Sequence, residues 1–97
     1  MWRHSVFRWI DWNIDHIAEH GIAPEEAEAV VCSAQPPYPK EIGGERFNVV
    51  GQGRGGRWIQ VGFILDPDDT IFVIHARPLT PREKSRIRRN HRRRGRQ

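Results

Sequence analysis

The sequence is poor in cysteine, with Cys32 as the single one in 97 residues. One cysteine excludes an internal disulfide and a cysteine-based zinc cluster. Cys32 ends the apolar run at residues 29–32, so we expect a small buried side chain rather than a nucleophile. The sequence shows no apolar run of membrane-spanning length, and its start, MWRHSVFRWIDW, is too polar for a secretory leader. We therefore expect a cytoplasmic protein that does not insert into a membrane.

Acidic residues are scarce near the end of the chain. Residues 82–97 hold nine of the sixteen Lys and Arg residues but one of the twelve Asp and Glu residues. The net charge of +4 therefore divides into about −4 for residues 1–81 and about +8 for residues 82–97. Such a split suggests an interaction tail. Lys84 is the tail's one lysine, and guanidinium groups grip phosphates at two points. Nucleic acid is therefore the leading partner class, an acidic protein surface the second, and a solvated terminus the third interpretation.

Two helices are predicted in the first third of the chain. Asp11 is placed to cap a helix over residues 12–20, and Gly21 to end it in a left-handed conformation. A second helix starts near Pro24, which suits a first turn, and stops before the proline-rich residues 35–39.

Strands are predicted from alternation and from the turns between them. A short strand at residues 7–10 could precede the helices, and GQGRGG at 51–56 is expected to form a flexible hairpin loop. The main strands span residues 45–51, 58–65 and 70–77.

The motif TPRE predicts the start of the last helix. Thr80 caps it, Pro81 takes the first helical position, and Glu83 reaches back to the cap. The order of elements predicts an α+β domain, namely a small antiparallel meander of three to four strands with two N-terminal helices and one C-terminal helix on one face. Residues 1–85 form this single domain, and residues 86–97 are a basic, arginine-rich extension.

Strict alternation assigns the strand residues to two faces. In the last strand it places Phe72, Ile74 and Ala76 on one face and Ile71, Val73, His75 and Arg77 on the other. The face away from the helices then gathers Arg46, Asn48, Gln60, His75 and Arg77, with Trp58 near its edge. This face is either a surface that binds phosphates and stacks a base or an ordinary solvated sheet face. His75 is either a general acid or base, or a polar residue at a strand end.

Two histidines, His16 and His20, lie four residues apart on the first predicted helix. A zinc site would need further ligands, and no HExxH pattern is present, so we predict no metal and no cofactor. The loop GQGRGGR lacks the GK[ST] of a Walker loop and predicts a mobile hairpin tip, with Arg54 and Arg57 as candidate contacts to an RNA backbone.

Three segments together resemble the BrnT-type toxins of bacterial toxin–antitoxin pairs: WIDWNIDHIAEHGIAPEEAEAVV (9–31), ERFNVVGQGRGGRWIQVGFI (45–64) and IFVIHARPLTPRE (71–83). The most specific parts are His20 followed by glycine, and Arg77 with Thr80 and Glu83. Two positions depart from the family pattern: Glu19 replaces a common lysine, and His16 replaces a common asparagine. Over roughly residues 9–85, the resemblance implies a RelE-like ribonuclease neutralised by an antitoxin, usually BrnA-like.

The resemblance implies catalytic positions for His20, Arg77 and Glu83, although a capping role is favoured for Glu83. Cleavage of this type needs no metal: an RNA 2′-hydroxyl attacks its own phosphate. We expect Arg77 and Arg46, assisted by Arg57, to hold the phosphorane charge, and His75 or His20 to transfer protons. The predicted RNA-binding residues are Arg46, Arg54, Arg57, Trp58, Arg82, Arg86 and Arg89. A noncatalytic nucleic-acid-binding domain and a protein-interaction domain are the alternatives.

Overall fold

The fold is that of a computed structural model, which describes the backbone of residues 6–95 and the side chains of residues 6–89. Four antiparallel strands form a meander in the order β1-β2-β3-β4. Their bounds are Lys40–Gly43 (β1), Arg46–Gln52 (β2), Trp58–Leu65 (β3) and Ile71–Pro78 (β4). Three α-helices accompany them: Asp11–Ala18 (α1), Pro24–Cys32 (α2) and Pro81–Gly95 (α3). The predicted α+β meander is confirmed.

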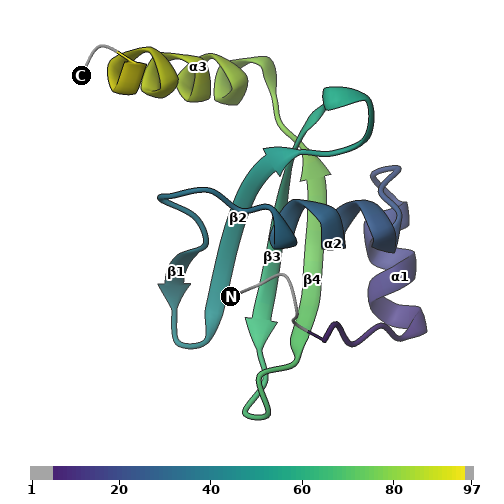
Figure 1. Ribbon diagram of the computed structural model, residues 1–97. Helices are drawn as coiled ribbons and strands as arrows, with labels where there is room; N and C mark the ends of the chain where they lie inside the picture. Colours follow the sequence, from purple (N-terminus) through teal and green to yellow (C-terminus); the bar gives the residue numbers. More distant parts are fainter. Residues whose placement is uncertain (1–5, 96–97) are drawn as a thin grey trace.

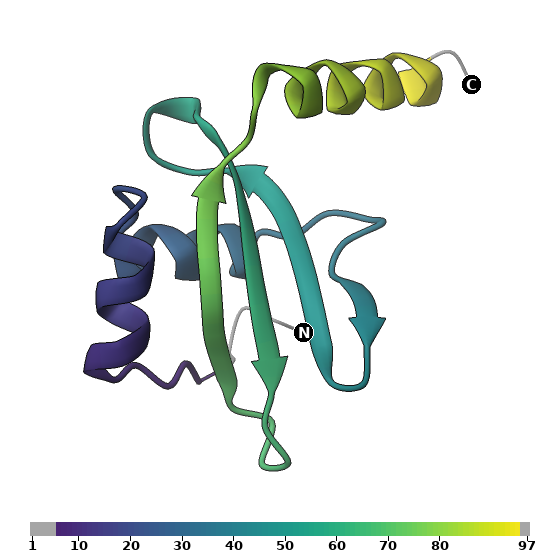
Figure 2. The ribbon, with the colours of Figure 1, turned by 180° about the vertical axis from the view of Figure 1, so that it is seen from behind.

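The helices occupy three different places around the sheet. Figure 1 shows α2 crossing one face, α1 beside β4, and α3 extending from the end of β4. Figure 2 looks onto the opposite face of the sheet, which α2 leaves uncovered. The prediction that all helices share one face is therefore wrong for α3, which lies beyond the end of the sheet. Among the described residues, no helix is long and apolar enough to cross a membrane.

Buried Asn13 organises the start of α1. Its Oδ1 accepts a 2.8 Å hydrogen bond from the backbone of Ile10, and its Nδ2 donates to the carbonyls of Arg8 and Val73 at 3.1 Å each. Ile10 therefore takes the N-cap position that the sequence assigned to Asp11, and α1 ends two residues earlier than predicted. The hydrogen bond to Val73 joins α1 to β4, and the other two hold the segment before the helix.

The meander differs from its prediction at both ends. β1 was missed, since its four residues are all exposed and carry no apolar alternation. The predicted strand at residues 7–10 is reduced to one parallel bridge between Phe7 and Ile71. Gly21 has the predicted left-handed conformation, with φ of 72°.

A bulge in β4 changes which side chains face the helices. Gly62 lies opposite His75, but the next residue, Phe63, lies opposite Val73, so Ile74 is an extra residue in β4. Strict alternation was therefore wrong for the first half of β4: Ile71 and Val73 are buried in the core together with Ala76. Phe72, opposite Ile64, shares the uncovered face with His75 and Arg77.

The core lies between α2, α1 and one face of the sheet. Phe63, fully buried, stacks on Phe47 with ring centroids 5.4 Å apart. The other fully buried apolar side chains come from every neighbouring element: Ile17, Ile22, Ala27, Val30, Val31, Val49, Ile59, Val61, Ile71, Val73 and Ala76. Cys32 at the end of α2 is only partly buried, and burial together with the nearby Glu28 carboxylate raises the pKa of its thiol. A thiolate nucleophile is not favoured there.

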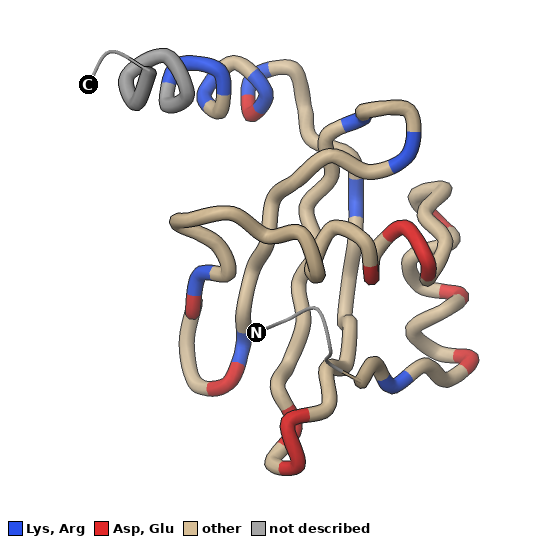
Figure 3. Tube along the Cα trace, in the orientation of Figure 1, with Lys and Arg blue, Asp and Glu red and all other residues tan. Residues whose placement is uncertain are grey.

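The start of α3 is the predicted capping box. Thr80 Oγ1 accepts the backbone N–H of Glu83 at 3.2 Å, and Glu83 Oε1 accepts the backbone N–H of Thr80 at 2.9 Å. The helix continues to Gly95, so the boundary proposed at residue 85 falls inside it. Figure 3 shows Lys and Arg concentrated on α3, and Asp and Glu on α1, α2 and the turn between β3 and β4.

Candidate nucleic-acid interface

The ring of His75 lies over Gly62 on the uncovered face of the sheet. A Cβ on Gly62 would collide with the imidazole Nε2, so the glycine creates the space that the ring occupies. Partial burial lowers the pKa of His75, and the positive charges of Arg77, His16 and His20 lower it further. His75 is therefore neutral near pH 7 and able to accept a proton.

Arg77 lies two residues further along β4, opposite Gln60. Its two terminal nitrogens donate to the two carboxylate oxygens of Glu83 at 2.9 Å each, and Nη1 also donates to the carbonyl of Pro78 at 3.2 Å. Within the described residues, three of its five N–H donors are used, and the edge formed by Nε–H and the second Nη2–H remains for a ligand. The Arg77 guanidinium and the Thr80 N–H lower the pKa of Glu83 to about 2. Its predicted capping role is confirmed, and its predicted catalytic role stays a prediction.

An aromatic stack from α1 borders this face. Trp12, an exposed side chain, stacks on His16 at 5.1 Å between centroids and on Phe72 at 6.0 Å. Arg8 covers the Phe72 ring at 4.0 Å and pairs with Asp66 at 3.2 Å. The stack places His16, whose spacing from His20 first raised the question of a metal site, on the side of α1 that adjoins β4. Among the described side chains, no group of three or more His, Cys, Asp or Glu is arranged to hold a metal ion.

The hairpin loop that was expected to be mobile is attached to α2. The buried Glu26 accepts hydrogen bonds from Arg57 Nη2 at 2.9 Å, from Arg57 Nε at 3.2 Å and from the backbone of Arg54 at 2.9 Å. Arg57 also donates to the Gly21 carbonyl at 2.7 Å. The Arg57 hydrogen bond outweighs burial and holds the pKa of Glu26 below its ordinary value. The loop is therefore not a free tip but is anchored by a partly buried ion pair.

This ion pair was missed in the sequence. Glu26 was interpreted only as a favourable charge at a helix start, yet it lies four residues before the core residue Val30 and so on the buried side of α2. That spacing was the available signal. The predicted RNA contacts of Arg54 and Arg57 stay predictions. To bind RNA, the Arg57 side chain would have to do so beside its partners Glu26 and Gly21.

The predicted group of phosphate-binding arginines is dispersed. Arg46 lies opposite Ile64, four residues along β3 from Gln60, the partner of Arg77. At about 3.3 Å per residue, this separates Arg46 from Arg77 by roughly 13 Å along the strands. Arg57 is held against α2, on the covered side. Arg77 is therefore the one predicted phosphorane ligand that lies beside His75.

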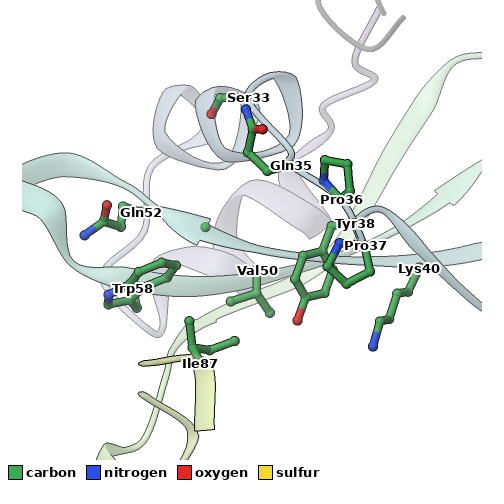
Figure 4. Close-up of a pocket in the computed structure, with 11 residues that line it drawn as sticks. Ser33, Gln35, Pro36, Pro37, Tyr38, Lys40, Val50, Gln52, Trp58 and Ile87 are labelled. Atoms are coloured by element: carbon green, nitrogen blue, oxygen red, sulfur yellow. The ribbon is translucent and has the colours of Figure 1, made fainter. Parts of the chain in front are cut away.

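Other predicted contact residues surround this centre. Asn48, opposite Gly62, has a buried Oδ1 with no hydrogen-bond partner among the residues the structure describes. Trp58 lines a pocket between the sheet and α3 (Figure 4). Three of the predicted RNA-binding arginines are exposed on α3: Arg82, Arg86 and Arg89. The arginines after residue 89 lie outside the described side chains.

Comparison of the chain with protein-family models, with curated proteins and with solved structures finds no match.

Proposed function

We propose that this protein is an endoribonuclease toxin of a toxin–antitoxin pair that cleaves RNA on the uncovered face of its sheet, in the cytoplasm, without a metal. The observation that carries the proposal is the placement of a neutral His75 beside Arg77, with His16 of α1 and His20 of the following turn near enough to affect its pKa. The resemblance of three sequence segments to BrnT-type toxins supports the toxin role.

The reaction follows from the chemistry of these groups. His75 accepts the proton of an RNA 2′-hydroxyl, whose oxygen attacks the adjacent phosphorus. The remaining N–H edge of Arg77 stabilises the added charge of the phosphorane, and Glu83 holds that guanidinium in place before the substrate arrives. His20, in its protonated form, gives a proton to the departing 5′-oxygen. The products are a 2′,3′-cyclic phosphate and a 5′-hydroxyl.

Cleavage of end-labelled RNA at low salt, with a chelator present, tests the activity. We expect wild-type protein to cut RNA and Arg77→Ala or His75→Ala to lower the rate by about 10²-fold or more. The same sequence made of DNA is the matched control, because it lacks the attacking hydroxyl and must stay intact. Intact RNA after incubation with clean, folded wild-type protein would rule out the ribonuclease.

The toxin role has its own test in cells. Expression of the wild-type protein should arrest growth, and Arg77→Ala should relieve the arrest. Co-expression of a BrnA-like antitoxin, encoded by a neighbouring reading frame, should restore growth. Unimpaired growth at a protein level equal to that of a known toxin would contradict this role.

A noncatalytic RNA-binding domain is the second candidate. It is favoured by Glu83, which already neutralises Arg77, and by the exposed arginines on α3. It predicts salt-sensitive binding of RNA without any product. The cleavage assay distinguishes the two.

A further inference from the structure

A pocket of about 380 Å³ lies beside the proposed site, at the ends of β2 and β3 (Figure 4). Its walls come from the segment after α2, from the start of β1, from β2 and β3, and from α3. Trp58 and Tyr38 lie on opposite sides of it, with Val50 and Ile87 between them. Gln52 lies beside Trp58, and Lys40 is the one charged side chain of the lining.

The lining suits a flat, uncharged ring that carries polar edges. Two aromatic rings and two aliphatic side chains provide apolar walls, and the lining includes the amides of Gln35 and Gln52. Gln52 Nε2 donates one hydrogen bond to the Gly56 carbonyl, which leaves its second N–H and its oxygen for a ligand. Sites for small planar ligands typically combine such walls with a few polar groups. None of the lining residues is acidic, and α3, the helix that contributes Ile87 to the lining, carries exposed arginines. An anionic backbone can therefore pass close to this pocket.

Two connections join the pocket to Arg77. Trp58 precedes Gln60 by two residues on the same face of β3, and Gln60 lies opposite Arg77. On α3, Ile87 follows Glu83 by four residues, which places it on the same side of the helix, one turn or about 5.4 Å further along. The carboxylate that holds Arg77 thus also fixes the helical face that closes the pocket.

We infer that this pocket is a nucleobase subsite, an inference that rests on the proposed action on RNA. One unstacked base enters it and lies against Trp58, while the neighbouring phosphates follow Arg77 and the arginines of α3. Sequence-specific recognition of RNA commonly uses unstacked bases on aromatic side chains. The pocket would then set the base preference next to the position that Arg77 binds.

An abasic scan tests the inference without any cleavage. The ligands are 2′-O-methyl oligonucleotides, which cannot attack their own phosphate, each with one base removed at a different position. We expect removal at one position to lower the affinity about tenfold, as measured by fluorescence anisotropy at low salt. Trp58→Ala and Ile87→Asp should abolish this position dependence. Ile87→Asp is the safer variant for folding because, of the α3 side chains that the structure describes, none belongs to the buried core.

The matched control is Ile42→Asp on β1, which changes an exposed isoleucine away from the pocket and should keep the position dependence. If the protein binds the oligonucleotides normally and base removal has the same effect at every position, the subsite is overturned and the proposed function is left intact. No binding of any oligonucleotide would overturn both. If Ile87→Asp leaves the scan unchanged but prevents binding of an antitoxin, the pocket holds a protein side chain and the inference fails.

Discussion

The carboxylate of Glu83 accepts a hydrogen bond of 2.9 Å from each terminal nitrogen of the Arg77 guanidinium. The same carboxylate accepts the backbone N–H of Thr80 and so caps α3. One side chain therefore positions an arginine at the end of β4 and fixes the start of the helix that follows. The short motif from Arg77 to Glu83 therefore caps a helix and, in the proposed function, also holds the arginine that binds phosphate.

Glu83→Gln should weaken this link in a pH-dependent way. The pKa of Glu83 is about 2 in the folded protein, below its ordinary value of 4.5, so its stabilising contribution is present above pH 4.5 and is lost as the pH falls toward 2. Thermal unfolding of wild-type protein should therefore become easier over this acid range. The glutamine variant, which carries no titrating group there, should show a shallower dependence. Identical profiles for the two proteins would contradict the assignment.

Glu26→Ala should destabilise the protein. The substitution removes a buried carboxylate that bonds Arg57 twice and Arg54 once, and we expect the free energy of unfolding to fall by about 2 kcal/mol. Urea denaturation measures the change. Glu25→Ala, at the neighbouring exposed position, is the matched control and should cost less than about 0.5 kcal/mol. Faster amide exchange in the loop at residues 53–57 should accompany the loss.

Gly62→Ala should conflict with the His75 ring. The added methyl group would collide with Nε2, and we expect a loss of about 1–3 kcal/mol in the free energy of unfolding. In a His75→Ala background the same change should cost much less, because the ring is gone. A double-mutant cycle measures this coupling. Equal costs in both backgrounds would show that the ring does not occupy the space above Gly62.

The pKa of His75 should set the pH below which the rate of RNA cleavage falls. Burial, followed by the charges of Arg77, His16 and His20, lowers this pKa below 6.5, so a base at this position stays active until the pH falls below the shifted value. His20→Gln and Arg77→Gln each remove a positive charge and should move the pKa of His75 upward. NMR titration of the ring measures the shift independently of activity. An unchanged titration in both variants would exclude the proposed cluster.

The arginines of α3 should provide salt-dependent affinity. Arg86→Ala and Arg89→Ala should each lower the slope of log affinity against log salt by about 0.7 for single-stranded RNA, if each side chain contacts one phosphate. Asp68→Asn at the turn between β3 and β4 is a control on the opposite end of the sheet from α3 (Figure 1). A slope that stays constant after both arginine changes would show that α3 does not contact the RNA backbone.

The sequence by itself determined the elements whose signals are local. The capping box at Thr80, the proline at the start of α2, the left-handed Gly21 and the alternation of β3 each depend on residues a few positions apart. They define the order of helices and strands, and the meander follows from it. The charge of the tail is likewise a property of composition alone.

Tertiary structure decided the rest, because it depends on partners far apart in the chain. The bulge at Ile74 reverses the alternation in β4, and it is set by pairing with β3 rather than by any local residue. Glu26 meets Arg57 only after α2 has packed on the sheet, so this ion pair could not be predicted from the sequence. The pocket at Trp58 likewise exists only because Ile87 of α3 lies near the end of β2 and the start of β3. Local patterns fix the elements, whereas burial, pairing and charge neutralisation across the fold decide which side chains remain for a ligand.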